Sequence, residues 1–213
     1  MNQAAIHRSL SGSLHKNPSP RQLSAHYEKR LAANLTLLQD LFFSLYPENA
    51  YSESFKRLVK TLSSLFKSRP QELQIQDLRR LGEGNWYQSE KWIGMQLYVD
   101  RFSENLQGLE ERLPYLESLG INFLHLMPIT TRPQGPNDGG YAVNSYTEID
   151  PAYGSAQDLS RLTGKFRERG ICLMLDFVVN HTSDEFPWAL QAKKGDPYYQ
   201  SFYYTYPDRT IPD

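Results

Sequence analysis

The chain has 213 residues, of which 39% are hydrophobic and 22% charged, and its formal net charge is −1. This composition is typical of a globular protein with one or two domains, and the near-neutral charge argues against nucleic acid or an anionic membrane as the main partner. Cys172 is the single cysteine, which excludes an internal disulfide and a multi-cysteine metal site. No apolar run reaches the ~18–20 residues of a transmembrane helix, and the N-terminus lacks the apolar core of a signal peptide, so we expect a cytoplasmic protein by default.

The N-terminal part of the chain has a helical hydrophobic pattern that follows a short lead. Residues 1–20 end in Asn-Pro-Ser-Pro, and we predict that they form a disordered lead. Over residues 21–83, apolar residues recur at helical spacing, in one stripe formed by Leu31, Leu35, Leu38, Phe42 and Leu45 and a second from Phe55 to Phe66, and charged residues cover the other faces. Pro47 ends the first helix, and Pro70 suits the first turn of a third, shorter one. This pattern predicts an antiparallel all-helical domain whose apolar stripes form its core.

From residue 84 onward, short apolar runs alternate with helical stripes. The runs cover residues 93–99, 121–127 and 171–177. The helical stripe between the first two runs contains Pro114, which predicts a kink or a late helix start. Ser155 and Asp158 form a capping box that opens the next helix. Strands that alternate with helices predict right-handed βαβ units, a parallel sheet and therefore the α/β fold class.

Polar residues follow the second and third predicted strands. The connection over residues 128–154 is longer than the roughly 2–6 residues of a plain βα loop, and it contains Asp138 and Tyr141. The third apolar run ends in Asp176 and, a few residues later, His181. Because α/β barrels carry their reactive groups at the carboxyl ends of parallel strands, these residues are candidates for a functional site. The alternative is a core strand with a polar exit.

The motifs around these residues resemble those of the α-amylase family of glycoside hydrolases. Asp-x-x-x-Asn-His after the third strand resembles the first signature region of that family, and Gly-Tyr after the second strand resembles its sugar-stacking tyrosine. The stretches LHLMP, DGGYAV, DFVVNHTSDEFPWA and FYYTYPDR more narrowly resemble amylosucrases, which take the glucosyl unit from sucrose and extend an α-1,4-glucan. The resemblance is strong over residues 84–213 and moderate over residues 21–83.

The resemblance implies a helical N-terminal domain followed by the first three βα units of an incomplete (β/α)8 TIM barrel. Residues 84–182 would form the start of this catalytic barrel. Residues 183–213 would begin an excursion domain after the third strand, truncated at the end of the chain. The aromatic residues beyond Trp188 either pack within this excursion or line an acceptor groove.

The resemblance also assigns roles to four residues. Tyr141 would offer its ring face to a pyranose, and His181 would donate a hydrogen bond to a sugar hydroxyl. Asp138 would close the floor of the sucrose pocket by pairing with an arginine far downstream. Asp176 matches the supporting aspartate of the family rather than its nucleophile. The alternatives are that Tyr141 packs on its neighbours in the loop and that His181 is a structural cap.

The predicted chemistry depends on groups that the sequence does not supply. Asn180 matches a calcium ligand of many α-amylases, but amylosucrases resemble a calcium-free branch and the ~6–8 oxygens of a calcium cage are missing nearby, so we predict neither metal nor cofactor. A retaining glycosidase needs a nucleophile and an acid/base about 5–5.5 Å apart, and in the family these follow the fourth and fifth strands. We expect both to lie beyond Asp213, which would leave this chain alone inactive.

The sequence therefore predicts the N-terminal part of an amylosucrase-like retaining glucosyltransferase that acts on sucrose and α-glucan. The alternatives are a sucrose or α-glucan hydrolase of the same family, and a non-catalytic carbohydrate-binding chain.

Overall fold

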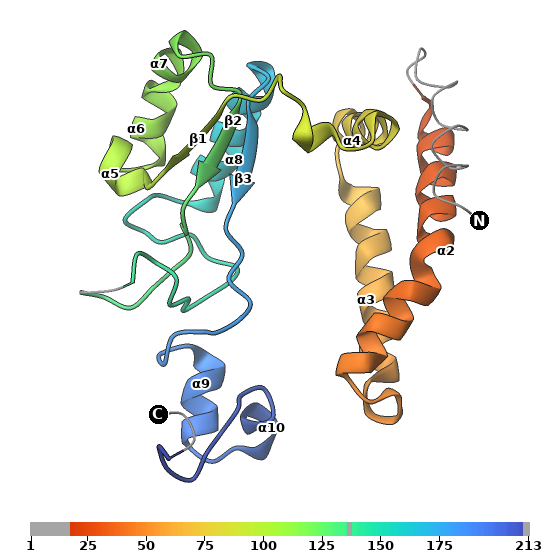
Figure 1. The fold of residues 1–213 in the computed structure, drawn as a ribbon, viewed down its shortest axis with the longest axis vertical. Helices are drawn as coiled ribbons and strands as arrows, with labels where there is room; N and C mark the ends of the chain where they lie inside the picture. The colour runs from red at the N-terminus through yellow and green to blue at the C-terminus, as the bar shows by residue number, and fades with distance from the viewer. Residues whose placement is uncertain (1–17, 136–137, 211–213) are drawn as a thin grey trace. The chain divides into compact units, whose positions relative to one another are not determined.

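The computed structural model describes residues 18–135 and 138–210. The chain divides into two compact units, Met1–Ser89 and Glu90–Asp213 (Figure 1). Most of the predicted disordered lead lies outside the described residues. The end of that lead is ordered, because Ser19 caps the first helix and accepts a hydrogen bond from the Gln22 backbone N–H at 3.4 Å.

The described residues of the first unit form helices and a short helical turn. Its elements are α2 (Pro20–Leu45), α3 (Glu48–Ser68), α4 (Gln71–Glu83) and the 3-10 turn η1 (Trp86–Gln88). Pro47 and Pro70 each stand at the N-cap position of the helix that follows, where a missing N–H costs nothing. The helices therefore begin and end close to the positions that the prolines predict.

The apolar stripes of this unit are only partly buried. Phe42 of α2 packs on Phe55 of α3 with ring centroids 5.3 Å apart, and Tyr27 stacks on Phe66 at 4.2 Å. Leu45, however, belongs to the predicted core stripe and is 75% exposed. The prediction that the stripes form the core is thus wrong for Leu45, because Phe42 and Tyr46, one helical turn apart, make the contacts with α3 at this end of α2.

The second unit contains a parallel sheet with strand order β1-β2-β3. The strands are β1 (Gly94–Leu97), β2 (Phe123–Leu126) and β3 (Cys172–Leu175). In register, Leu97 lies beside Leu126, and Leu126 lies beside Leu175. This arrangement confirms the predicted α/β class and is consistent with the first three βα units of a TIM barrel.

The helices of this unit lie between the strands in the chain. They are α5 (Val99–Ser103), α6 (Leu106–Glu111), α7 (Leu113–Ser118) and α8 (Ala156–Glu168). Pro114 lies in the first turn of α7, and it divides the predicted stripe into α6 and α7. The capping box of α8 is confirmed, since the Ser155 hydroxyl accepts a hydrogen bond from the Asp158 backbone N–H at 3.2 Å. Val99 differs from the prediction, because it begins α5 instead of extending β1.

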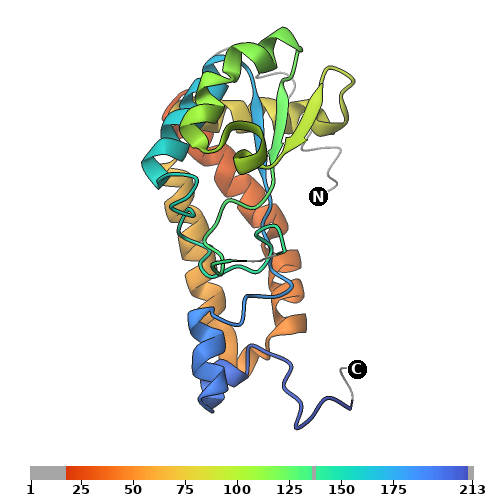
Figure 2. The ribbon, with the colours of Figure 1, turned by 90° about the vertical axis from the view of Figure 1, so that its left-hand side faces the viewer.

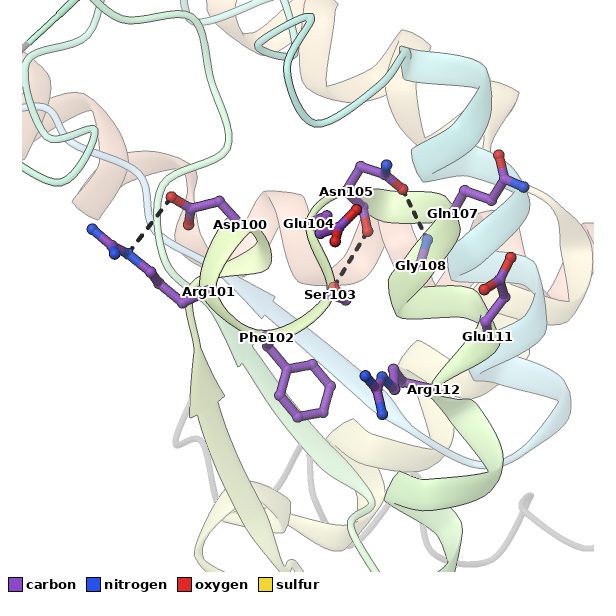
Figure 3. Close-up of a pocket in the computed structure, with 10 residues that line it drawn as sticks. All are labelled: Asp100, Arg101, Phe102, Ser103, Glu104, Asn105, Gln107, Gly108, Glu111 and Arg112. Carbon is purple, nitrogen blue, oxygen red and sulfur yellow. Dashed lines mark hydrogen bonds and ion pairs between the residues drawn. The ribbon is translucent and has the colours of Figure 1, made fainter.

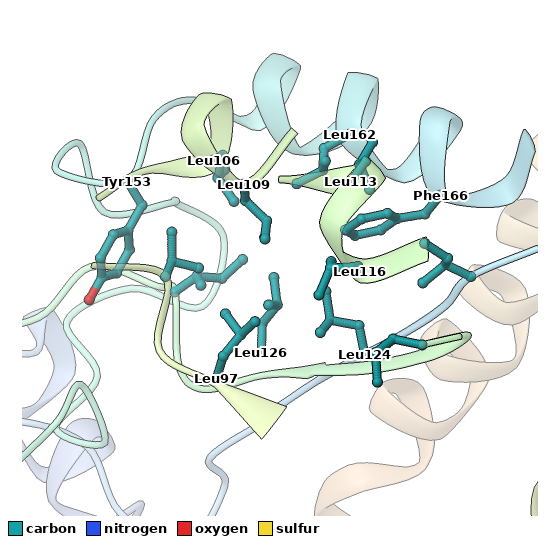
Figure 4. Close-up of a cluster of buried hydrophobic side chains, with 14 residues drawn as sticks. Leu97, Leu106, Leu109, Leu113, Leu116, Leu124, Leu126, Tyr153, Leu162 and Phe166 are labelled. Atoms are coloured by element: carbon teal, nitrogen blue, oxygen red, sulfur yellow. The ribbon is translucent and has the colours of Figure 1, made fainter. Parts of the chain in front are cut away.

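Alternation along the strands gives the sheet two different faces. The helices α6, α7 and α8 lie on one side of the sheet (Figure 2). Leu97, Leu124 and Leu126 point into the hydrophobic core on this side, where leucines of α6 and α7 and Leu162 and Phe166 of α8 cover them (Figure 4). The alternate residues, which include His125 and Met174, must point to the opposite face. Met174 is 42% exposed. Gln96, His125 and Met174, which lie in register across the three strands, are therefore on the face that these helices leave open.

The C-terminal segment forms α9 (Pro187–Lys193) and α10 (Pro197–Gln200), which the sequence analysis did not identify. Each helix begins with a proline in its first turn. Trp188 of α9 lies 4.6 Å from Phe202, measured between ring centroids. Among the described residues, no helix combines the length and the apolar character that a membrane span requires.

Candidate functional site

Three side chains from different segments meet at the carboxyl ends of the strands. Asp176 follows the last residue of β3, His125 lies within β2, and Tyr141 lies in the connection from β2 to α8. His125 is in register with Met174, so Asp176 stands two residues further along the neighbouring strand. A separation of two residues returns a side chain to the same face of a sheet, which brings His125 and Asp176 together.

The Asp176 carboxylate accepts one hydrogen bond on each oxygen. His125 Nε2 lies 2.9 Å from Oδ1, and the Tyr141 hydroxyl lies 2.9 Å from Oδ2. The His125 and Asp176 side chains are 18% and 23% exposed. An ionised carboxylate has no proton to donate, so both neighbours act as donors. The three residues therefore form one hydrogen-bonded cluster, which we call the Asp176 cluster.

The environment of Tyr141 keeps its hydroxyl protonated. Burial raises the pKa of Tyr141 to about 12, and the hydrogen bond to Asp176 and the charge of that carboxylate act in the same direction. The Met127 sulfur lies 4.0 Å from the same hydroxyl. A single O–H makes its stronger bond to the nearer, charged acceptor, so the hydroxyl points to Asp176. Near pH 7, Tyr141 is a neutral phenol with a fixed orientation.

The loop that carries Tyr141 is folded onto itself. Thr130 and Ile149 form an isolated antiparallel bridge at its base, and the Asp150 backbone N–H donates to the carbonyl of Ile129 at 2.9 Å. Arg132 pairs with Asp150 at 3.3 Å, measured from Nε to Oδ2. These contacts anchor a long connection, whose described residues form no regular helix or strand, and they give Tyr141 a defined position.

Two glycines are needed directly before Tyr141. Gly139 and Gly140 have φ values of 85° and 94°, in the left-handed region that other residues rarely adopt. A β-carbon on Gly139 would lie 2.9 Å from the Tyr98 hydroxyl, and one on Gly140 would lie 3.3 Å from Pro128. The Asp-Gly-Gly-Tyr motif thus has a structural reason, because only glycine allows this turn so close to the end of β2.

Asp138 and His181 lie near the Asp176 cluster in sequence but have other contacts. The Asp138 carboxylate accepts a hydrogen bond from the Ala142 backbone N–H at 2.9 Å, which closes the turn before Tyr141. The His181 side chain is exposed, and the carbonyl of His181 accepts a hydrogen bond from the Tyr146 hydroxyl at 3.3 Å. Of the four predicted site residues, the structure joins Asp176 and Tyr141 by a direct hydrogen bond.

Two open hollows lie beside the ends of the strands. One has a volume of about 600 Å³. It is lined by Tyr98, Asp100, Arg101, Arg132, Gly135, Asp138 and Gly139. A second, of about 630 Å³, lies along α5 and the start of α6, where the Asn105 side chain accepts a hydrogen bond from the Gly108 N–H at 2.9 Å (Figure 3). The first hollow is lined by a predicted site residue, Asp138, and is therefore the better candidate for a substrate-binding site.

His125 is the site residue that the sequence analysis missed. It is the one polar side chain in the apolar stretch Phe-Leu-His-Leu of β2, and that isolated position was the available signal. Within the described residues, no group of three or more His, Cys, Asp or Glu side chains is placed to hold a metal ion.

Comparisons with known proteins identify the family. Residues 51–212 match the catalytic domain of α-amylase, so the chain belongs to the α-amylase family, whose members are glycoside hydrolases and transferases. The match includes most of α3, all of α4 and the second unit up to residue 212. The family assignment made from the motifs is thereby confirmed.

The individual relatives have different activities, so they support the family assignment and not one particular activity. The oligo-1,6-glucosidase of Heyndrickxia coagulans is 38% identical over 113 residues, which is 51% of this chain and 20% of that enzyme. The palatinase of Erwinia rhapontici is 40% identical over 100 residues, 46% of this chain and 18% of the relative. The crystal structure of isomaltulose synthase from Erwinia rhapontici NX5 superimposes with a TM-score of 0.50 and 33% identity, over 54% of this chain and 22% of that structure.

The chain spans about a fifth of the length of these relatives. None of the three is named an amylosucrase, so the narrower resemblance to amylosucrases is not shown by them.

Proposed function

We propose that the chain forms part of the glucosyl-binding site of an amylosucrase-like retaining glucosyltransferase, which moves glucose from sucrose to an α-1,4-glucan. One observation carries this proposal: Tyr141 is held by Asp176 at the carboxyl ends of parallel strands, where TIM-barrel enzymes place their active sites. A fixed, neutral aromatic ring at this edge is suited to bind the apolar face of a pyranose.

Each predicted residue has a role in this proposal. Tyr141 stacks on the glucosyl ring, and Asp176 supplies a fixed negative charge and further acceptor positions beneath it. His181, which is exposed after β3, turns toward a sugar hydroxyl when substrate is present. Asp138, at the hollow of about 600 Å³, pairs with an arginine from a later part of the enzyme.

The reaction is a double displacement that uses two carboxylates about 5–5.5 Å apart. The nucleophile attacks the anomeric carbon of sucrose, the bond to the fructosyl oxygen breaks, and the general acid protonates that oxygen. A glucan hydroxyl then loses its proton to the same acid/base residue and attacks the anomeric carbon, which releases the nucleophile. We place both carboxylates beyond residue 213, so this chain supplies binding groups and not the reacting pair.

The choice of amylosucrase rests on the stretches LHLMP, DGGYAV and FYYTYPDR of this sequence. Relatives named oligo-1,6-glucosidase and trehalose-6-phosphate hydrolase favour a second candidate, a hydrolase in which water replaces the glucan hydroxyl. A third candidate, a carbohydrate-binding chain without catalysis, would use the same binding residues. A cytoplasmic location remains a prediction.

Sucrose consumption distinguishes these candidates when free glucose and free fructose are measured separately. In the enzyme with a complete barrel, transfer predicts fructose well in excess of glucose, whereas hydrolysis predicts equal amounts. The 213-residue chain alone is expected to consume no sucrose. Consumption by this chain alone would contradict the placement of the acid pair, and a complete enzyme inert toward sucrose would contradict the donor.

A further inference from the structure

His125 approaches the Asp176 cluster from the central strand of the sheet. Its strand, β2, is hydrogen-bonded to β1 on one side and to β3 on the other, so the backbone that carries His125 is held on both sides. The side chain is 18% exposed and points to the face that α6, α7 and α8 do not cover. Neither core packing nor the predicted site roles account for a histidine here.

The hydrogen bond fixes the tautomer of His125. Asp176 Oδ1, at 2.9 Å from Nε2, belongs to a carboxylate that can only accept while it is ionised. The proton of the neutral imidazole must therefore be on Nε2. His125 is a donor at a defined atom, and its partner is the same carboxylate that holds Tyr141.

Two donors from different segments restrain the carboxylate more than either does alone. The torsion of an Asp carboxyl group is broad when it is unrestrained. Here Oδ1 is held from β2 and Oδ2 is held by the Tyr141 hydroxyl, each at 2.9 Å. Removing the donor on Oδ1 would free the carboxyl group to rotate and would leave the Tyr141 hydroxyl without a fixed acceptor.

The remaining partner of Tyr141 cannot replace this restraint. The Met127 sulfur lies 4.0 Å from the hydroxyl and is itself the acceptor of a hydrogen bond from Gln96 Nε2 at 2.6 Å. Thioether sulfur is a weak acceptor. The orientation of Tyr141 therefore depends on Asp176, and the orientation of Asp176 depends on His125.

We propose that His125 is a positioning residue, whose Nε2–H holds the Asp176 carboxylate in the rotamer that orients Tyr141 toward a pyranose. The sugar-binding part of this inference rests on the proposed function. The positioning part rests on the two hydrogen bonds alone, and it concerns a residue that does not touch the sugar.

A pair of amide substitutions tests the position of the donor. In His125→Gln the amide nitrogen can reach the place of Nε2, whereas in His125→Asn it reaches only as far as Nδ1. In His125→Asn, sugar binding must also order the freed Asp176 and Tyr141 side chains, and this cost corresponds to about a tenfold loss of affinity. We expect His125→Asn to bind sucrose about tenfold more weakly than the wild-type chain, and His125→Gln to stay within about threefold. Equal affinity in all three proteins, or equal loss in both variants, would overturn the proposal.

A second measurement keeps the two proposals separate. Tyrosine labelled with ¹³C at Cζ reports the hydroxyl environment by NMR, and Tyr141→Phe assigns the signal of Tyr141. We expect this signal to move in His125→Asn and to stay in place in His125→Gln. If the signals behave in this way but no protein binds sugar, the positioning role stands and the proposed function fails. If the Tyr141 signal is unchanged in His125→Asn, the positioning role fails whatever the sugar affinity.

Discussion

The substitution Gly108→Ala should have two opposite effects on stability, one from helix propensity and one from a tertiary contact. It lies inside α6 with helical backbone geometry, where alanine normally stabilises by about 1 kcal/mol relative to glycine. A β-carbon at Gly108, however, would overlap the backbone carbonyl oxygen of Ser103 and lie 3.1 Å from the Ser103 carbonyl carbon (Figure 3). The turn from α5 into α6 brings these two backbone segments together, and a backbone atom cannot rotate away as the end of a side chain can.

The expected magnitude is a net loss of stability of about 2 kcal/mol for Gly108→Ala. Overpacking costs roughly 1–3 kcal/mol, and the upper end applies because the obstructing atom is backbone; the gain in helix propensity offsets about 1 kcal/mol. With an m-value of ~2 kcal/mol per molar urea, the midpoint of unfolding falls by about 1 M.

Gly164→Ala is the matched control, because the nearest atom to its added β-carbon is Arg167 Nη2 at 3.8 Å, an ordinary contact. It should raise the midpoint by up to about 0.5 M. Urea unfolding followed by circular dichroism measures both. If Gly108→Ala stabilises the chain as much as Gly164→Ala does, the close approach of α5 and α6 is wrong.

Other predictions concern the site and the cap of α8. Asp176→Asn removes the charge and the strong acceptor beside Tyr141, so the pKa of Tyr141 should fall from about 12 toward its ordinary value near 10, as read from the ¹³Cζ shift during a pH titration. In the wild-type chain, the pKa of Tyr141 is higher in the folded than in the unfolded state, so the unfolded state loses the Tyr141 proton first as the pH rises. The contribution of Tyr141 to stability should therefore decline from about pH 10 to about pH 12. Unfolding free energies that rise over this interval would contradict the hydrogen bond. Ser155→Ala should cost about 1 kcal/mol in unfolding free energy through loss of the cap. The pKa of Asp158 is about 2, chiefly because its carboxylate accepts a hydrogen bond from the Ser155 hydroxyl, and Ser155→Ala should raise this pKa. The loss of stability on acidification below about pH 4 should then be smaller than in the wild-type chain. An unchanged titration of the Asp158 carboxyl group by NMR would argue against the capping box.

Local sequence signals were sufficient to predict most of the secondary structure of the second unit. The capping box at Ser155 and the break at Pro114 act within one helical turn, so their structural effects follow from neighbouring residues. The exposure of Leu45 was not predictable in this way. Periodicity shows that a helix has an apolar face, but how much of this face a neighbouring helix covers is a tertiary property.

The site was predictable only where its residues lie in contiguous sequence motifs. Tyr141 and Asp176 lie in motifs that are contiguous in sequence, and the structure joins them by a hydrogen bond. The contribution of His125 depends on the register between β2 and β3, which places residue 125 beside residue 174. The residue pattern of one strand does not determine its register with the neighbouring strand. The lone histidine in an apolar strand was therefore visible in the sequence, whereas its partner was not.

The central claim is that Tyr141 forms the sugar-binding surface of this chain. Saturation-transfer NMR of sucrose with the 213-residue chain tests it most directly, with Tyr141→Leu as the altered protein and Tyr115→Leu as the control. Tyr115 is an exposed tyrosine on α7, a helix that packs against the opposite face of the sheet. We expect sucrose to receive saturation from the wild-type chain and from Tyr115→Leu but not from Tyr141→Leu. Equal saturation transfer from all three proteins would contradict it.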